Sequence, residues 1–397
     1  MPERLFPVAT LSLASVRALL EPHRPPCLSL YMPTHRNVPA NLVDVHQFRR
    51  LVDSLEAGLL LKHHRDEADR LLEPFHRLDA NATFWQHTLD GLAVLSSDGK
   101  AEVFRVQHPF QPLALSSDRF YTMPLVRAAA AIGRFDVLAL SSREARVYEG
   151  TTDQLDPFDL GDASASGSQG TLERLDFIDE DTFQAHRVRQ RSGPMGSVHG
   201  GFGSKSDDID ADTERFFREV DRIVVERVSN RSHLPLLLVA ISEHASLFRK
   251  ISGNRLLLDE GIASDPKMLE GPDLVPLVRS IAKGDRRSRI ARLVTVFSRA
   301  RDEGRGAGDL SDIARAAVAG RVATLLVEQD RLEPGKLDRT SGAIAWGADL
   351  ETKSGIELAG DLVGILAEEV LLRDGEIVSL RPIEMPTETG VAAIYRY

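Results

Sequence analysis

Cysteine is almost absent from this sequence, because Cys27 is the only one among 397 residues. A single thiol excludes a disulfide within the chain and a zinc site built from several cysteines. The pattern His-Glu-x-x-His is also missing, and the twelve histidines are scattered along the chain. We therefore expect no metal site and no other cofactor.

Long hydrophobic runs are missing as well. No stretch is apolar over enough residues to cross a bilayer. The N-terminus has no basic region followed by an apolar run and a small-residue cleavage site, so we expect no signal peptide. The chain is 42% hydrophobic and 27% charged, which is typical of a soluble globular protein. These features predict a cytoplasmic protein that does not enter membranes.

The sequence also has no excess of basic charge. The formal net charge of −10 excludes a protein coated with basic patches for bulk nucleic-acid binding. Two segments depart from this average. Residues 186–205 contain several arginines and no acid, and residues 279–305 contain nine cations against Asp285, Asp302 and Glu303. The second run is typical of a solvated helix face. The first is more unusual, because it borders a glycine-rich stretch.

That stretch, GPMGSVHGGFGSK at 193–205, places five glycines in front of an amphipathic segment. It does not match the nucleotide-binding loop pattern, since one residue too many separates the glycines from Lys205, and Gly-x-Gly-x-x-Gly is absent. Gly200 and Gly201 permit backbone angles closed to other residues and let another surface approach closely. Neighbouring cations suit RNA phosphates. The alternative is a surface loop without a binding role.

Alternating helical and strand patterns predict an α/β protein. We expect three domains, at residues 1–132, 133–265 and 266–397. The segment GLAVLSSDGKAEVFRV predicts a hairpin, and RFFREVDRIVVERV predicts a helix with one apolar stripe. Pro74 is expected to bend or break a helix, Asp210 or Asp212 to cap one, and LVPLVRSIA and SRIARLVTVFSRARD to form two helices. The last third is expected to form a three-layer α/β/α sandwich.

The order of these segments resembles the superfamily of archaeal and eukaryotic class-1 release factors and Pelota, most closely its bacterial relatives. The resemblance rests on the strand pair FDVLALSSREARVYEG, the loop GSVHGGFGSK with its returning helix, and the C-terminal AAVAGRVATLLVEQD, ELAGDLVGILAEEVLLRDGEIVSL and GVAAIYRY. It implies a mixed α/β N-terminal domain, a ribonuclease-H-like middle domain and a C-terminal domain like the kink-turn-binding ribosomal-protein fold.

In release factors the loop carries Gly-Gly-Gln, whose glutamine helps to position water against the peptidyl-tRNA ester. Gly200 and Gly201 match the two glycines, but Phe202 occupies the glutamine position. Phenylalanine cannot orient water by hydrogen bonding. His199 is a candidate acid or base. The stop-codon motif Asn-Ile-Lys-Ser is absent, so codon reading is not expected.

The resulting hypothesis is a translation-associated factor that binds the ribosome, ribosomal RNA or tRNA in ribosome rescue or stress response. A partner GTPase is expected to bind its C-terminal domain. The predicted RNA-binding residues are Arg187, Arg189, Arg191, His199, Gly200, Gly201, Phe202 and Lys205. One alternative is a peptidyl-tRNA hydrolase that works without the glutamine. The other is a protein-interaction scaffold that does not bind RNA.

Overall fold

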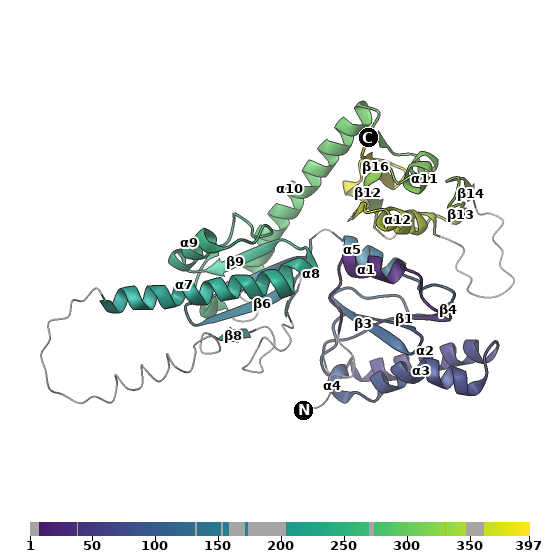
Figure 1. Ribbon diagram of the computed structural model, residues 1–397, viewed down its shortest axis with the longest axis horizontal. Coiled ribbons are helices and arrows are strands. Elements are labelled where there is room, and N and C mark those ends of the chain that lie inside the picture. Colours follow the sequence, from purple (N-terminus) through teal and green to yellow (C-terminus); the bar gives the residue numbers. More distant parts are fainter. Residues whose placement is uncertain are drawn as a thin grey trace, which may run out of the picture. The chain divides into compact units, whose positions relative to one another are not determined.

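The computed structural model describes residues 8–37, 39–131, 133–151, 154–158, 171–173, 204–269, 274–329, 331–346 and 361–397 (Figure 1). The chain forms two compact units. Unit 1 comprises Met1–Ile132 and Ser288–Tyr397, and unit 2 comprises Gly133–Arg287. Among the described residues, no helix combines the length and apolarity that a membrane crossing requires.

The first sheet of unit 1 is antiparallel, with strand order β3-β2-β1-β4. Its strands are β1 (Cys27–Pro33), β2 (Gly91–Ser97), β3 (Lys100–Val106) and β4 (Leu113–Ser117). Asp98 and Gly99 join β2 to β3 with positive φ angles of 49° and 76°. Two such residues make the tight turn that suits the twist of a hairpin. The hairpin predicted from Ser-Asp-Gly is confirmed.

Helices cover both faces of this sheet. Helices α2 (Leu42–Leu60) and α3 (Arg65–Asp79) pack on one face, and α1 (Leu13–Leu20) and α5 (Met123–Ala130) pack on the other. The short α4 (Ala82–Trp85) follows α3. Pro74 lies inside α3, which continues to Asp79. The expected break at Pro74 is therefore wrong, because the buried, apolar side of α3 keeps the helix packed through that position.

The second sheet of unit 1 has the strand order β11-β16-β12-β15. Its strands are β11 (Gly306–Ala307), β12 (Val322–Glu328), β15 (Glu376–Leu380) and β16 (Val391–Tyr395). Helices α11 (Leu310–Val318) and α12 (Leu362–Leu372) cover one face, and α10 (Leu274–Asp302) covers the other. The strand pair β13 (Gly335–Leu337) and β14 (Ile344–Trp346) is separate, and Pro382–Glu384 form a single helical turn.

One hydrophobic cluster joins the two ends of the chain in unit 1. It contains Leu125 and Val126 from α5 and Leu366 and Val370 from α12, all nearly or fully buried. Apolar side chains from both sheets extend the same cluster. Segments from the two ends of the chain therefore share a core.

Helix α10 runs without interruption from Leu274 to Asp302. The prediction of two helices here is wrong. Gly284 lies at the expected break, and glycine lowers the stability of a helix by about 1 kcal/mol relative to alanine. Apolar side chains on either side, including Val278 and Phe297, are buried and hold both flanks in the helical conformation.

Unit 2 contains a mixed sheet with the order β10-β9-β5-β6-β7. Its strands are β5 (Phe135–Leu140), β6 (Glu144–Gly150), β7 (Leu155–Pro157), β9 (Leu236–Ala240) and β10 (Ile262–Ala263), and β8 (Thr171–Glu173) also pairs with β6. Strands β5, β9 and β10 are parallel, whereas β6 is antiparallel to its neighbours.

Two helices, α7 (Ser204–Val224) and α9 (Ser242–Ile251), pack against one face of this sheet. The chain continues from α7 through a π-helical turn (Val225–Ser229) into α8 (Asn230–Ser232), and Pro266–Leu269 form a further turn. Leu274, Val278 and Ala282 of α10 contribute to the cluster on the other face.

The architecture confirms the predicted mixture of α-helices and sheets. Strands of the second sheet in unit 1 lie between α10 and the pair α11 and α12, as expected for the last third of the chain. The three-domain division at 1–132, 133–265 and 266–397 stays a prediction, because compact units are not equivalent to domains that fold separately. The ribonuclease-H-like and kink-turn-binding assignments also stay predictions.

Candidate functional site

Most of the predicted RNA-binding residues lie outside the part of the chain that the structure describes. These residues are Arg187, Arg189, Arg191, His199, Gly200, Gly201 and Phe202. Lys205 belongs to the first turn of α7, of which only the backbone is described there. The predicted site stays a prediction. The structure does describe the elements on either side of it in the sequence, β8 and α7, which we call the framework of the loop.

The framework begins with β8, after which the chain enters residues 174–203. Leu172 is fully buried against unit 2, and Thr171 is 7% exposed. β8 pairs with β6 in the register Glu144 to Glu173 and Arg146 to Thr171. The segment that carries the predicted loop thus leaves from a strand anchored in the sheet.

The framework ends with α7, which begins at Ser204. The apolar stripe predicted for this helix is confirmed, since its members are at most 4% exposed: Phe216, Phe217, Val220, Ile223, Val224 and Val228. Phe217 also contacts Phe248 of α9 edge to face, with ring centroids 6.1 Å apart. Asp210 and Asp212 lie within α7, so the expected capping role for either of them is wrong.

The far end of α7 leads to a buried polar pair. Ser232 of α8 donates a hydrogen bond of 2.6 Å to Oδ2 of Asp136, the second residue of β5. Asp136 is fully buried, and its Oδ1 has no hydrogen-bond partner among the described residues. The pair fixes the end of the helical segment that returns from the predicted loop to the central strand of the sheet.

Burial raises the pKa of Asp136 to about 8. The neighbouring negative charge of Glu149 contributes to this rise, whereas the Ser232 hydrogen bond and the Arg134 charge partly offset it. Arg134 itself contacts Glu149 at 2.5 Å. A carboxyl group that titrates near neutral pH is suited to proton transfer. Asp136 has no exposed surface, however, so no substrate reaches it in this structure, and we assign it a structural role.

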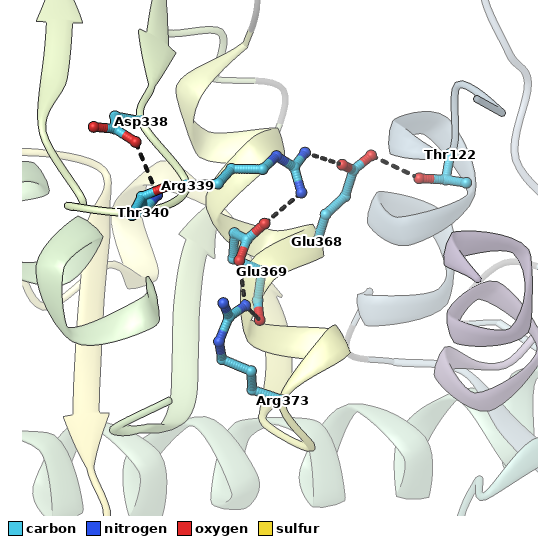
Figure 2. A network of polar contacts seen from close by, with 7 residues as sticks. All are labelled: Thr122, Asp338, Arg339, Thr340, Glu368, Glu369 and Arg373. Carbon is cyan, nitrogen blue, oxygen red and sulfur yellow. Dashed lines mark hydrogen bonds and ion pairs between the residues drawn. The ribbon is translucent and has the colours of Figure 1, made fainter. Parts of the chain in front are cut away.

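A second polar network lies in unit 1, on the side of α12 that faces the β13–β14 pair (Figure 2). Arg339, in the turn between these strands, contacts Glu368 at 3.2 Å and also pairs with Glu369. Glu369 is 2% exposed and pairs in addition with Arg373. Two adjacent carboxylates of α12 thereby hold the β13–β14 turn against the helix.

The turn itself is stabilised by Asp338. Its Oδ1 accepts a hydrogen bond of 2.8 Å from the Thr340 backbone, as drawn in Figure 2, and its Oδ2 accepts one of 2.5 Å from Ser341. The Ser341 hydrogen bond, followed by that of Thr340, lowers the pKa of Asp338. Arg339 is therefore presented by an ordered turn.

A third polar pair was not foreseen from the sequence. Asp44 in the first turn of α2 is fully buried and accepts hydrogen bonds from the His35 backbone at 2.8 Å and from His35 Nδ1 at 2.7 Å. Across the described residues, no group of three or more His, Cys, Asp or Glu side chains is arranged to hold a metal ion. Two ligands from one pair do not make a metal site.

The sequence gives some indication of the buried carboxylates. Asp136 is the one acid in the apolar run FDVLAL, and Glu368 and Glu369 interrupt the apolar α12 segment. An acid inside an apolar segment predicts a buried, partnered carboxylate. The identity of the partners was not accessible in this way, because Thr122 and Arg339 are distant from Glu368 in the sequence.

Comparison with known proteins gives a family match over part of the chain. Residues 134–321 match the model of bacterial archaeo-eukaryotic release factor family 3. No curated protein matches the sequence. The resemblance expected from the sequence is confirmed over residues 134–321.

Several solved structures are similar at low identity. The archaeal translation termination factor aRF1 is 14% identical, with all of both chains covered and a TM-score of 0.26. Dom34 of S. cerevisiae, a translation termination-like factor that interacts with Hbs1, is 14% identical over 75% of this chain and 74% of its own, with a TM-score of 0.37. Pelota of Archaeoglobus fulgidus is 10% identical over 98% and 93%, with a TM-score of 0.26.

Proposed function

We propose that this protein is a translation-associated factor that binds the ribosome or tRNA through its basic glycine-rich loop, in ribosome rescue or a stress response. The observation that carries the proposal is the match of residues 134–321 to a release factor family. The matched segment includes the loop together with β8 and α7, which flank it in unit 2.

Physical chemistry supports this use of the loop. Arg187, Arg189, Arg191 and Lys205 supply positive charge for phosphates without a nearby acid in the sequence. Gly200 and Gly201 offer the small cross-section that a narrow RNA cavity requires. His199 and Phe202 offer flat rings on which unpaired bases stack. Strand β8 and helix α7, which flank the loop in the sequence, are both packed in unit 2.

Binding rather than hydrolysis is the proposed activity. A loop that positions water against an ester needs a side chain that donates or accepts a hydrogen bond, at the position that follows the two glycines. Phe202 offers neither. We further propose that the C-terminal segment receives a partner translation GTPase, and that the protein acts in the cytoplasm.

The proposal is tested by co-sedimentation with purified bacterial ribosomes and separated subunits over a salt series. The wild type is compared with a variant in which Arg187, Arg189, Arg191 and Lys205 are all changed to alanine. Binding that weakens with salt and is lost in the variant is the expected result, because each phosphate contact releases counterions.

A matched control removes four exposed, ion-paired arginines of unit 1 and the same total charge: Arg49, Arg65, Arg77 and Arg315. This control should bind like the wild type. Absence of binding at low salt would reject the proposal and favour a protein-interaction scaffold. Peptidyl-tRNA cleavage that His199→Ala abolishes, with binding intact, would establish the hydrolase instead.

A further inference from the structure

Helix α10 carries an arginine-rich face that the proposed loop site does not use. Within unit 1, Arg289, Arg292, Val296 and Arg299 follow one another at three- and four-residue spacings. At 100° per residue these positions lie within about 80° of one another around the helix axis. The spacing places three guanidinium groups along one side of the helix, over about 15 Å.

The adjoining side of the same segment is fixed to the second sheet of unit 1. Ile290, Phe297 and Ala300 are at most 9% exposed and pack against strand residues of that sheet. The arginine face is accessible: Arg292 is exposed, Val296 is 52% exposed and the Arg299 side chain is 81% exposed. Arg289 is half-buried. Packing therefore holds the helix in an orientation that keeps the arginines at the surface.

Two of these arginines have no acidic counterpart. Within the described ranges, neither Arg289 nor Arg292 makes an ion pair or a side-chain hydrogen bond, although Asp285 lies one turn before Arg289. Arg299 differs, since Glu303 accepts from its Nε at 2.9 Å. Other exposed arginines of unit 1 do have a carboxylate partner, such as Arg65 with Glu56 and Arg77 with Glu73. Uncompensated cations in a chain of net charge −10 favour an anionic partner.

The chemistry of the face indicates which anion. Phe297 is the one aromatic residue of α10, and it is buried. Single-stranded nucleic acids are usually held by stacking of their bases on exposed aromatic rings. Double-stranded RNA is recognised mainly through its shape and its phosphates and 2′-hydroxyls. A row of arginines without a stacking platform fits the second class.

We propose that Arg289 and Arg292, continued by Arg299, form a second RNA contact that binds the phosphate backbone of a double-stranded RNA segment. The choice of RNA as the partner rests on the proposed function. The residues themselves are separate from the glycine-rich loop, so the two contacts are testable independently.

The test measures binding of a fluorescently labelled RNA duplex of about 16 base pairs to the full chain, at salt concentrations from about 50 to about 200 mM. The double variant Arg289→Ala and Arg292→Ala should bind more weakly, by about tenfold at low salt. The slope of its log affinity against log salt concentration should become shallower by the amount expected for about two lost phosphate contacts. The Arg289→Lys and Arg292→Lys variant should stay near the wild type, because it keeps both charges.

The matched control is the double variant Arg65→Ala and Arg77→Ala, which removes two exposed but ion-paired arginines of unit 1. It should bind the duplex like the wild type. All variants should have the circular dichroism spectrum of the wild type, which shows that they are folded. Equal binding by the alanine variant and the wild type would overturn the proposal. Equal losses in the control, or in the lysine variant, would overturn it as well.

Two further arms separate the proposal from the loop function. A preference for single-stranded RNA that depends on Arg289 and Arg292 would overturn the assignment to duplex RNA. In a chain that already carries the four alanine substitutions of the loop, Arg289→Ala and Arg292→Ala should weaken duplex binding by the same factor as in the wild-type chain. If ribosome binding proves independent of the loop while duplex binding still depends on α10, the loop function fails and the α10 contact stands.

Discussion

Thr122 donates a hydrogen bond of 2.9 Å to Oε1 of Glu368, and thereby connects the residue before α5 with α12 across 246 positions of the sequence. Thr122 is fully buried, so the bond is shielded from water. Glu368 uses its other oxygen for Arg339 (Figure 2). One carboxylate therefore links the first sheet's helices, α12 and the β13–β14 turn within unit 1.

Thr122→Val should destabilise unit 1 by about 1–2 kcal/mol, because valine keeps the shape but removes a hydrogen bond to a charged group. Chemical denaturation measures the change. Thr295→Val is the control, since Thr295 is exposed and its hydroxyl donates to the Ala291 carbonyl of its own helix. Equal midpoints for the two variants would show that the Thr122 bond does not contribute.

Glu369→Ala should cost more, about 2–4 kcal/mol, because it leaves Arg339 and Arg373 without the carboxylate between them. The partial exposure of both arginines keeps the cost below that of a fully buried pair. Removal of Asp312, whose pair with Arg315 is exposed, should cost less than about 1 kcal/mol. Urea denaturation of the two variants provides the comparison, and similar losses would contradict a special role for Glu369.

Asp136→Asn should change how the free energy of unfolding depends on pH. The pKa of Asp136 is about 8 in the folded chain and about 4 in an unfolded one, so the folded state binds more protons between these values. Its contribution to stability is complete at low pH and is lost as pH rises toward 8. Asparagine does not titrate and can still accept from Ser232.

The variant should therefore match the wild type near pH 4 and exceed its stability by on the order of 2–4 kcal/mol at pH 7. The difference should level off above pH 8, where both states of the wild type are ionised. Denaturation at a series of pH values gives the curve. A difference that does not vary with pH would refute the raised pKa.

Gly342→Ala should destabilise the β13–β14 turn. Gly342 has a φ of +74°, and a Cβ there would lie 2.7 Å from the Arg315 Cα. Gly99 has a similar φ of +76° with open space around it. Gly99→Ala should cost about 1–2 kcal/mol for backbone strain alone, and Gly342→Ala about 1–3 kcal/mol more for the clash. Thermal denaturation distinguishes them, and equal costs would argue against the contact.

Local patterns predicted many elements of the fold correctly. The apolar stripe from Phe216 to Val228 identified α7, because helical periodicity reports which side is buried. Asp98 and Gly99 identified the β2–β3 turn, since few other pairs accept two positive φ angles. Both features depend only on neighbours in the sequence.

Features that depend on tertiary packing were missed. Pro74 was expected to bend or break one helix, and residues 274–302 were expected to form two helices. Burial on either side of Pro74 and Gly284 overrides their weak helix propensity and keeps each helix continuous. Start positions were also uncertain, as α7 begins six residues before Asp210. The partners of Asp136 and Glu368 could not be inferred, because they come together only after the sheets and helices have assembled. The loop residues at 187–202 remain predictions of the sequence alone.

The shared core of unit 1 also constrains the order of events during synthesis. The apolar surfaces of α1 and α5 emerge from the ribosome long before α11 and α12, which cover them in the finished protein. Unit 2, whose residues are contiguous, is completed in the interval. A nascent chain therefore holds an uncovered apolar surface for the time needed to translate more than half of its length. Premature termination before α12 has been made would leave part of that surface permanently open and make the fragment a substrate for chaperones and proteases.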